Sequence, residues 1–429
     1  MRWNRLRLFS LWILLLPLTL HAQDNPLPLY DLPEPFAYPV QNSSTIAITR
    51  GGRVLVANAF VNSVSLILPG TGEIEAEWET GAEPKSVTIT PNNLRALAVS
   101  ADGLLVIDLE SNEIEALYPL EGQPNGLVAD DENAYISLQD HDEIIVMEIE
   151  SGEIVQRIAT PPYPAGLSLW ADFLYVTHYE SGQFSMIYLP AGEVVRTIQP
   201  DSQATLFNAV LVNPINGVAY LAQSINTSLV DNRFVPMLYV VDLETMLVTE
   251  RINLTVADRY VSMPYALAQP SNRSRLYIAH AGSNDVTVLN LDTGLADTHF
   301  TTGANPRGIL FNSGFTQVYT YDAVDGTLSA FDTQFFGLLD AIPTSSQPIP
   351  AQTQLGARLF YGATDQRLSA IPTIACASCH YVEQLSNTSL FNLEAETLND
   401  HIEVFQGGSG LDAESLDMQA LVDFLRNVP

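Results

Sequence analysis

Short runs in which hydrophobic and polar residues alternate fill the chain from residue 44 to residue 350. The alternation has a period of two, and the runs are bounded by polar turns, several of the Asp-Gly or Asn-Gly type. Such a pattern is typical of antiparallel strands joined in hairpins. The sequence therefore predicts a mainly β structure over this part of the chain.

A unit of about 40 residues repeats within this region, and each unit begins with a proline ahead of an apolar strand. This proline is found at Pro84, Pro124 and Pro164 and, after a longer interval, at Pro264, Pro306 and Pro348. Units of this length with four strands each predict the blades of a β-propeller. We expect seven blades, at residues 44–84, 85–124, 125–164, 165–204, 205–264, 265–306 and 307–350. The fifth carries an insertion around residues 224–236.

Two strand sequences resemble a known repeat. Residues 174–177 (Leu-Tyr-Val-Thr) and 276–279 (Leu-Tyr-Ile-Ala) are similar to the YVTN-type repeat of bacterial seven-bladed propellers. The resemblance covers residues 44–350 and implies the propeller fold. It leaves function open, because propellers serve catalysis, ligand binding and scaffolding alike.

After Pro350 the periodicity becomes helical. Leu355 and Leu359 share a face within residues 354–361, and Met418, Leu421, Val422 and Leu425 do so within residues 413–428. The Ser- and Pro-containing stretch at residues 344–350 reads as a linker. We therefore expect a small all-α domain over residues 351–429.

Between the two predicted helices lies the sequence Cys-Ala-Ser-Cys-His at residues 376–380. The pattern is that of covalent c-type haem attachment. Two thiols on one helical turn can each add to a haem vinyl group, and the adjacent imidazole then reaches the iron. The alternative is a disulfide between the only two cysteines of the chain. We favour one haem c on Cys376, Cys379 and His380.

The flanking residues resemble the first haem segment of bacterial di-haem cytochrome c peroxidases and the related MauG-type proteins. The matching residues are 355–360 (Leu-Gly-Ala-Arg-Leu-Phe), Asp365, 367–369 (Arg-Leu-Ser) and 374–380. The resemblance implies a cytochrome c-like domain. The chain departs from that family because its cysteines suffice for one attachment motif, so the two-haem peroxidase route is not expected within it.

The remaining haem contacts stay open. His401 and Met418 are the two downstream candidates for the sixth iron ligand. The alternative for His401 is a solvated side chain, and the alternative for Met418 is packing in the apolar face of its helix. A propeller residue is a further candidate, and so is an open site. Arg358 and Arg367 are candidates to pair haem propionates, or they form surface ion pairs.

Three propeller histidines also need an account. His178 and His280 follow equivalent strands in two blades, which predicts that both lie near one rim of the channel, and hydrogen-bonded structural histidines are the favoured interpretation. His141 lies in an acidic turn, where a solvated side chain is expected. Calcium between acidic loops is a weaker possibility, since no EF-hand spacing is present.

Residues 1–22 have the form of a cleaved signal peptide, with Arg2, Arg5 and Arg7 ahead of an apolar run that ends near Ala22. A retained signal anchor is the alternative. Residues 23–43 would form a lead-in, and no later segment is apolar enough to span a bilayer. We therefore expect an exported bacterial protein, periplasmic or extracellular.

The formal net charge is −31, and the acidic residues are spread along the chain. Nucleic acid is excluded as a partner by this charge, whereas a redox partner with a basic docking patch fits it. The favoured function is electron transfer, with the propeller as a docking or scaffold module. The alternatives are an oxidoreductase or weak peroxidase at an open haem, and a haem-based ligand or redox sensor, so enzymatic activity stays open.

Overall fold

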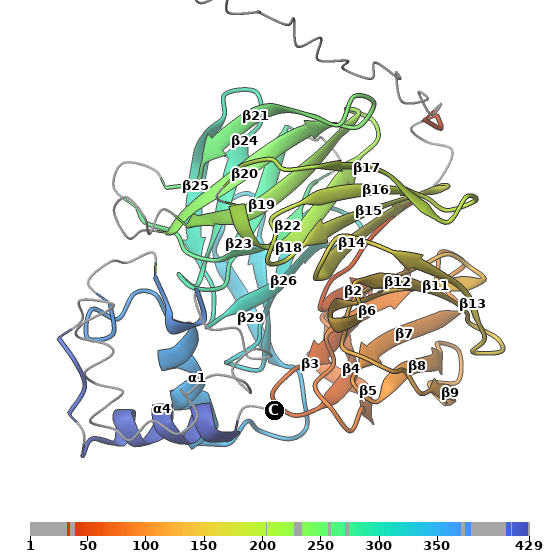
Figure 1. Ribbon diagram of the computed structural model, residues 1–429. Coiled ribbons are helices and arrows are strands. Elements are labelled where there is room, and N and C mark those ends of the chain that lie inside the picture. Colours follow the sequence, from red (N-terminus) through yellow and green to blue (C-terminus); the bar gives the residue numbers. More distant parts are fainter. Residues whose placement is uncertain are drawn as a thin grey trace, which may run out of the picture. The chain divides into compact units, whose positions relative to one another are not determined.

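The structure is a computed structural model, shown in Figure 1. It describes residues 32–34, 39–202, 204–226, 234–255, 259–270, 274–369, 374–378, 409–412 and 414–427. One compact unit spans Pro33–Pro429. The predicted signal peptide, Cys379, His380 and His401 lie outside the described residues.

Seven antiparallel sheets follow one another in sequence order, which confirms the predicted seven-bladed propeller. Each sheet holds four consecutive strands. The first four blades contain β2 (Ile46–Ile48), β3 (Val54–Asn58), β4 (Ser63–Leu68), β5 (Glu73–Glu79); β6 (Ser86–Ile89), β7 (Arg95–Ser100), β8 (Gly103–Asp108), β9 (Ile114–Tyr118); β10 (Pro124–Ala129), β11 (Asn133–Leu138), β12 (Glu143–Glu148), β13 (Ile154–Ala159); and β14 (Pro164–Trp170), β15 (Phe173–His178), β16 (Phe184–Tyr188), β17 (Glu193–Ile198). A short 3-10 helix, η1 (Gln139–His141), joins β11 to β12.

The fifth blade has the longest strands, as the predicted insertion requires. Its second strand ends at Asn226 and its third begins at Phe234, both within the predicted insertion. The last three blades contain β18 (Ala204–Asn213), β19 (Val218–Asn226), β20 (Phe234–Asp242), β21 (Leu247–Asn253); β22 (Pro264–Ala268), β23 (Arg275–His280), β24 (Asp285–Asn290), β25 (Leu295–Thr301); and β26 (Pro306–Phe311), β27 (Gln317–Asp322), β28 (Thr327–Asp332), β29 (Leu338–Pro343).

Apolar layers between neighbouring blades form the core. All five residues of β3 are buried, whereas the fourth strand β5 alternates exposed glutamates with covered residues. Within the described part of the chain, no strand is shared between the first and last blades. Packing closes the ring, because Ile46 and Val54 of blade 1 belong to one apolar cluster with Tyr321 of blade 7. Burial on both faces explains the continuous apolar runs of the middle strands.

An additional strand, β1 (Val40–Asn42), pairs antiparallel with β14, the first strand of blade 4. The predicted lead-in thus ends inside the propeller. Beyond β1, Ser43 bonds the backbone of Leu167 in blade 4, and the carbonyl oxygen of Ser44 accepts a hydrogen bond from Val87 N in blade 2. The N-terminal segment therefore runs along the innermost strands of two blades.

The prolines that mark the repeat have a clear role in four blades. Pro124, Pro164, Pro264 and Pro306 are the first residues of β10, β14, β22 and β26, where a missing N–H is tolerated. Pro348 was expected to begin a similar cycle, and that expectation is wrong. The chain leaves the last blade after β29 and enters a helix at Ala351, so Pro348 belongs to the connection.

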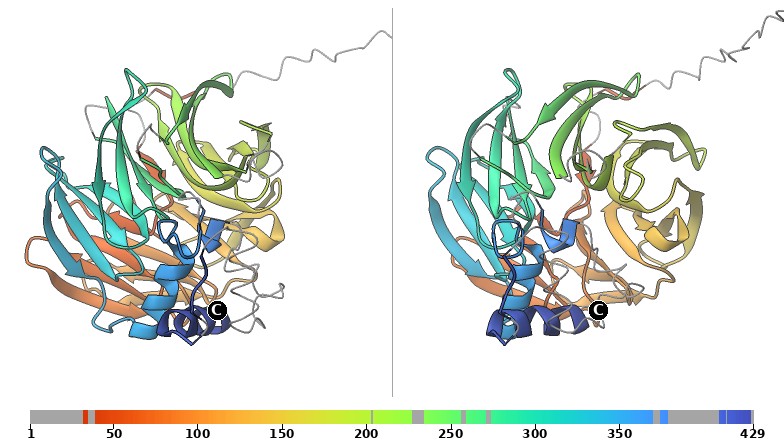
Figure 2. Two further views of the ribbon diagram at one scale, coloured as in Figure 1. Left: turned by 90° about the vertical axis from the view of Figure 1, so that its left-hand side faces the viewer. Right: turned by 60° about the vertical axis from the view of Figure 1, so that its left-hand side comes forward.

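Helix α1 (Ala351–Tyr361), the 3-10 helix η2 (Cys376–Ser378) and helix α4 (Leu416–Asn427) follow the propeller, close to the predicted helices. The Ser415 hydroxyl accepts a hydrogen bond from Met418 N, which caps the start of α4. In both views of Figure 2 the blue helices lie beside each other at one side of the blades. This helical segment is a small addition to a mainly β chain.

Candidate functional site

Cys376 is the one attachment residue that the structure describes. It opens the short helix η2 and is buried, with 8% of its surface exposed. Ala375 N donates to the Ser378 hydroxyl, and Ser378 N donates to the carbonyl oxygen of Ala375, so the two residues close the turn. The sequence thus places the first thiol on a tight turn with its side chain directed inward.

An apolar cluster surrounds Cys376 and joins α1, η2 and α4. Its members from this segment are Ala357, Leu359, Phe360, Tyr361, Leu368, Cys376, Ala377, Leu411, Met418, Leu421, Val422, Phe424 and Leu425. A covalently attached macrocycle needs apolar surroundings that exclude water and a thiol at their edge. The residues present fit such a group in this respect.

Helices α1 and α4 cross at Gly356. A Cβ atom added at this glycine would lie 2.3 Å from the carbonyl oxygen of Ala420 and 2.4 Å from Cβ of Phe424. The two backbones therefore approach more closely than any side chain at residue 356 would allow. This crossing holds together the two helices that flank the Cys-x-x-Cys-His sequence.

Both candidate propionate partners form ion pairs with carboxylates. Arg358 pairs with Asp325 of blade 7 at 2.5 Å. Arg367 pairs with Asp365 at 2.6 Å and with Asp417 of α4 at 2.7 Å. For both arginines the structure therefore shows ion pairs at the surface, which were the alternative to pairing with haem propionates.

Met418 is fully buried in the same cluster as Cys376, Leu421 and Leu425. Packing is therefore established for this residue, while its role as an iron ligand stays a prediction. The other candidate ligand, His401, lies outside the described part of the chain.

The helical segment joins the propeller around Arg307 of β26. The Arg307 guanidinium lies 4.8 Å from the ring centre of Tyr361 and 5.5 Å from that of Phe60, and it forms an ion pair with Glu83 at 3.4 Å. Further contacts are hydrogen bonds from Ala363 N to the carbonyl oxygen of Gly282 and from Gln354 Nε2 to that of Val324. Sequence reasoning missed this junction, because no local pattern marks a buried arginine.

His178 and His280 are structural. They end the second strands of two blades, and the same position in two further blades holds Asn58 and Asp322. Each of these side chains is hydrogen-bonded to a hydroxyl seven residues later, on Ser65, Ser185, Thr287 or Ser329. Burial lowers the pKa of His178 to about 4 and that of His280 to about 3, so both are neutral near pH 7.

His141 lies in η1 with its side chain 43% exposed, as expected for a solvated residue. Among the residues that the structure describes, no three His, Cys, Asp or Glu side chains gather closely enough to hold a metal ion. The described residues therefore offer no group of side chains for the suggested calcium site. Within the same residues, no helix has the length and apolar character needed to cross a membrane.

No protein-family model and no curated protein matches the chain. Among solved structures, hydrazine synthase from Kuenenia stuttgartiensis is similar, with 16% identity and a TM-score of 0.62 over 72% of this chain and 99% of that chain. Dihydro-heme d1 dehydrogenase NirN in complex with DHE shares 12% identity, with a TM-score of 0.49 over 70% of this chain and 66% of that chain. At such identity, the likeness to hydrazine synthase shows a common fold.

Proposed function

We propose that the chain is an exported c-type cytochrome that carries one covalent haem and transfers electrons, with the propeller as its scaffold and docking module. The observation that supports this most is the burial of Cys376, the first cysteine of the Cys-x-x-Cys-His sequence, in the apolar cluster between α1 and α4. A bound haem would supply one-electron redox chemistry.

The chain's own residues would have three tasks. The thiols of Cys376 and Cys379 would hold the haem covalently, and the imidazole of His380 would bind its iron. The apolar cluster around Cys376 would exclude water from the haem and so favour the iron state of lower charge. Met418 and His401 are the candidates for the opposite side.

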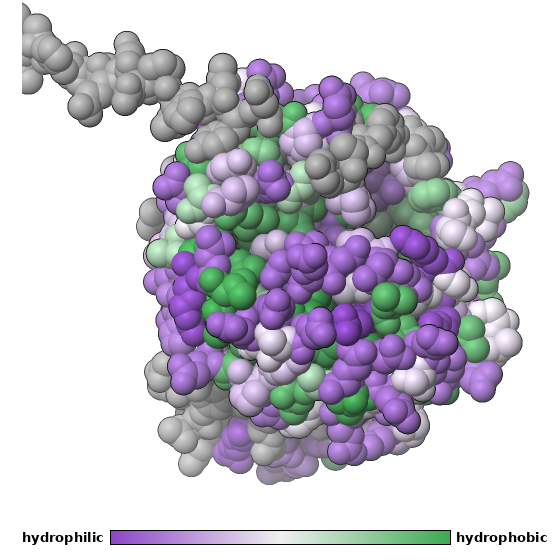
Figure 3. All heavy atoms as spheres, turned by 90° about the vertical axis from the view of Figure 1, so that its right-hand side faces the viewer, coloured by the Kyte–Doolittle hydropathy of each residue, from purple (hydrophilic) through white to green (hydrophobic). Residues whose placement is uncertain are grey.

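The acidic surface supports a partner with a basic patch. The net charge of −31 gives long-range attraction to such a partner and speeds the encounter at low ionic strength. Figure 3 shows one face of the molecule, on which hydrophilic residues prevail and hydrophobic ones form small scattered groups. Electrostatic docking of a transient partner suits a surface of this kind.

The decisive experiment is haem analysis of the full chain, expressed for export in a bacterium that matures c-type cytochromes. We expect haem staining on a denaturing gel and a pyridine haemochrome spectrum of the c type. The double variant Cys376→Ser/Cys379→Ser should lose both signals. Ser378→Ala, which changes the same turn outside the three attachment positions, should keep them. An unstained wild-type chain would refute the proposal.

The absorption spectrum with and without carbon monoxide then separates the functions. An electron carrier should be six-coordinate and should not react with carbon monoxide. A high-spin spectrum that shifts with carbon monoxide or peroxide would instead support an oxidoreductase, a weak peroxidase or a sensor. His401→Gln tests the distal ligand, since loss of the six-coordinate spectrum would identify this residue.

A further inference from the structure

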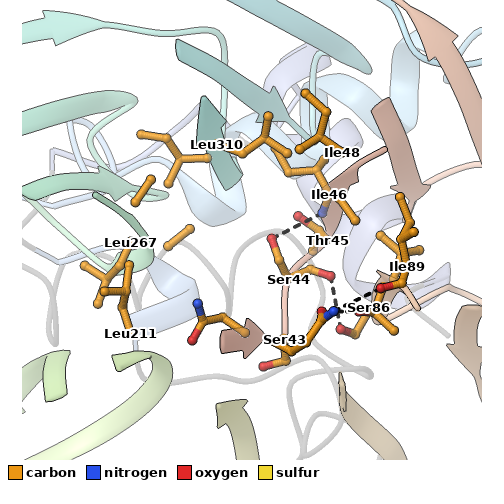
Figure 4. Close-up of a pocket in the computed structure, with 18 of the residues that line it drawn as sticks. Ser43, Ser44, Thr45, Ile46, Ile48, Ser86, Ile89, Leu211, Leu267 and Leu310 are labelled. Atoms are coloured by element: carbon orange, nitrogen blue, oxygen red, sulfur yellow. Dashed lines mark hydrogen bonds between the residues drawn. The ribbon is translucent and has the colours of Figure 1, made fainter. Parts of the chain in front are cut away.

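Strand β22 runs along the central channel of the propeller and begins beside the helical segment. The channel contains a central cavity of about 910 Å³, which Leu267 of this strand helps to line (Figure 4). Just ahead of the strand, the carbonyl oxygen of Ser262 accepts a hydrogen bond from Gly282 N, and the carbonyl oxygen of Gly282 accepts one from Ala363 N, two residues beyond α1. Met263, which follows Ser262, therefore lies where the propeller and the helical segment meet.

The Met263 side chain packs against the apolar cluster that contains Cys376. It is partly buried, whereas no part of Met418 in the same cluster is exposed. Among the residues that the structure describes, no other methionine of the propeller belongs to this cluster or packs against it. Met263 thus brings a thioether from the propeller to the margin of the surroundings of the first attachment cysteine.

The turn that carries Cys376 also contacts the propeller at a second place. Ile374, two residues before Cys376, is 6% exposed and shares an apolar cluster with Phe234 of blade 5. Tyr179, from the loop after β15 of blade 4, packs against the same cluster. A group attached at Cys376 is therefore held next to side chains of the propeller.

Met263 has a left-handed backbone conformation that restricts the direction of its side chain. Its φ angle is 56°, and Ala281 N donates to its carbonyl oxygen at 2.8 Å. Asn305 occupies the same position ahead of blade 7, with a φ angle of 60° and a hydrogen bond from Ala323 N. This conformation is unfavourable by about 1–2 kcal/mol for most residues that carry a side chain, and asparagine tolerates it better than methionine. The turn itself therefore does not favour methionine, so the reason for this residue lies in what its side chain contacts.

We propose that the thioether of Met263 is the sixth ligand of the haem iron, opposite His380. The proposal rests on the proposed function, because it requires a haem on Cys376 and Cys379. It makes the propeller part of the redox centre, since a thioether ligand raises the reduction potential of a c-type haem. The alternative is a methionine that only fills space between the propeller and the helical segment.

The oxidised absorption spectrum of the haem-loaded full chain tests the proposal. Wild type should show the long-wavelength charge-transfer band of a sulfur-ligated ferric haem and should not react with carbon monoxide. Met263→Leu preserves most of the side-chain volume and removes the sulfur. This variant should lose the band, bind carbon monoxide and keep its haem stain on a denaturing gel. Met263→Gln, which has a side chain of similar length and no sulfur, should behave in the same way.

Met246→Leu is the matched control. Met246 lies in the turn between β20 and β21 with a φ angle of 54°, is 1% exposed, and does not belong to the cluster around Cys376. Its substitution should leave the band and the carbon monoxide response unchanged. A haem-stained wild type without the sulfur band, or a Met263→Leu protein that keeps it, would overturn the proposal and leave the proposed function standing. An unstained wild-type chain would refute both.

Discussion

The guanidinium carbon of Arg307 lies 4.8 Å from the centre of the Tyr361 ring, so the first strand of the last blade directly contacts the last residue of α1. Tyr361 is buried and the Arg307 side chain is only 10% exposed, and the same guanidinium pairs with Glu83 ahead of blade 2. One cation thus connects the central cavity, two blades and the segment that carries Cys376. Loss of this contact should affect the attachment of the helical segment more than the propeller itself.

The contact between Arg307 and Tyr361 should be measurable as a coupling energy. Tyr361→Leu is expected to lower the free energy of unfolding by about 1–2 kcal/mol, because a desolvated cation–π contact is lost. Arg307→Met should lower it by about 3 kcal/mol, since Glu83 keeps only Lys85. A double-mutant cycle in urea should give about 1 kcal/mol of coupling. Tyr260→Leu, at a residue 58% exposed, is the control, and additive effects of the pair would contradict the prediction.

Gly356 should tolerate no side chain. Gly356→Ala would place a methyl group against Ala420 and Phe424, which forces α1 and α4 apart. We expect the helical segment to lose at least about 2 kcal/mol of stability, in line with other overpacked cores. Thermal unfolding measures the loss. Gly70→Ala is the matched control, because nothing lies within 4 Å of a Cβ there. Equal melting temperatures for the two variants would show that the helices do not cross at this point.

Asp322 should make stability depend on pH. Burial raises the pKa of Asp322 to about 7. The folded chain therefore retains a proton that the unfolded chain releases above about pH 4. The stability that this group contributes is present at low pH and is lost as the pH rises from about 4 to 7. Asp322→Asn removes that loss, so its stability relative to wild type should rise by about 4 kcal/mol over this range, measured by urea unfolding.

The chain itself offers the control for this change. Asn58 holds the equivalent position in blade 1 and donates to the Ser65 hydroxyl at 2.7 Å, where Asp322 accepts from Ser329 at 2.6 Å. Asn58→Asp should therefore show the opposite trend and lose stability relative to wild type as the pH rises. Parallel pH profiles for wild type and Asp322→Asn would refute the role of Asp322.

The sequence predicted the parts of the molecule that depend on local periodicity. Strand alternation and regularly spaced prolines gave seven blades, because every blade is folded from consecutive residues. The pairing of Val40–Asn42 with β14 was missed, since three residues at a separation of more than 120 carry no periodic signal. The Pro348 error has a related cause. A proline before an apolar run precedes a helix as readily as a strand.

The candidate site was only partly predictable for the same reason. A contiguous motif indicated Cys376, whereas the contacts of Arg307 with Glu83 and Tyr361 depend on how distant segments pack. One signal was present and went unused: a polar residue and a hydroxyl recur seven positions apart at the end of the second strand in four blades. Structural roles for His178 and His280 were already the favoured interpretation, and comparison of the repeats at that position would have identified their hydroxyl partners, Ser185 and Thr287.

Met418 should behave as a packing residue, and a conservative substitution can show it. Because Leu and Met have similar volumes, Met418→Leu is expected to change stability by less than about 1.5 kcal/mol, whereas Met418→Ala should lose about 2–5 kcal/mol. Met147→Leu, at a methionine of blade 3 that is 1% exposed, is the matched control. In haem-loaded protein, the oxidised spectrum of Met418→Leu should equal that of wild type. Loss of the long-wavelength charge-transfer band of a sulfur-ligated ferric haem in Met418→Leu alone would instead make Met418 the sixth ligand, because leucine preserves the packing and removes the sulfur.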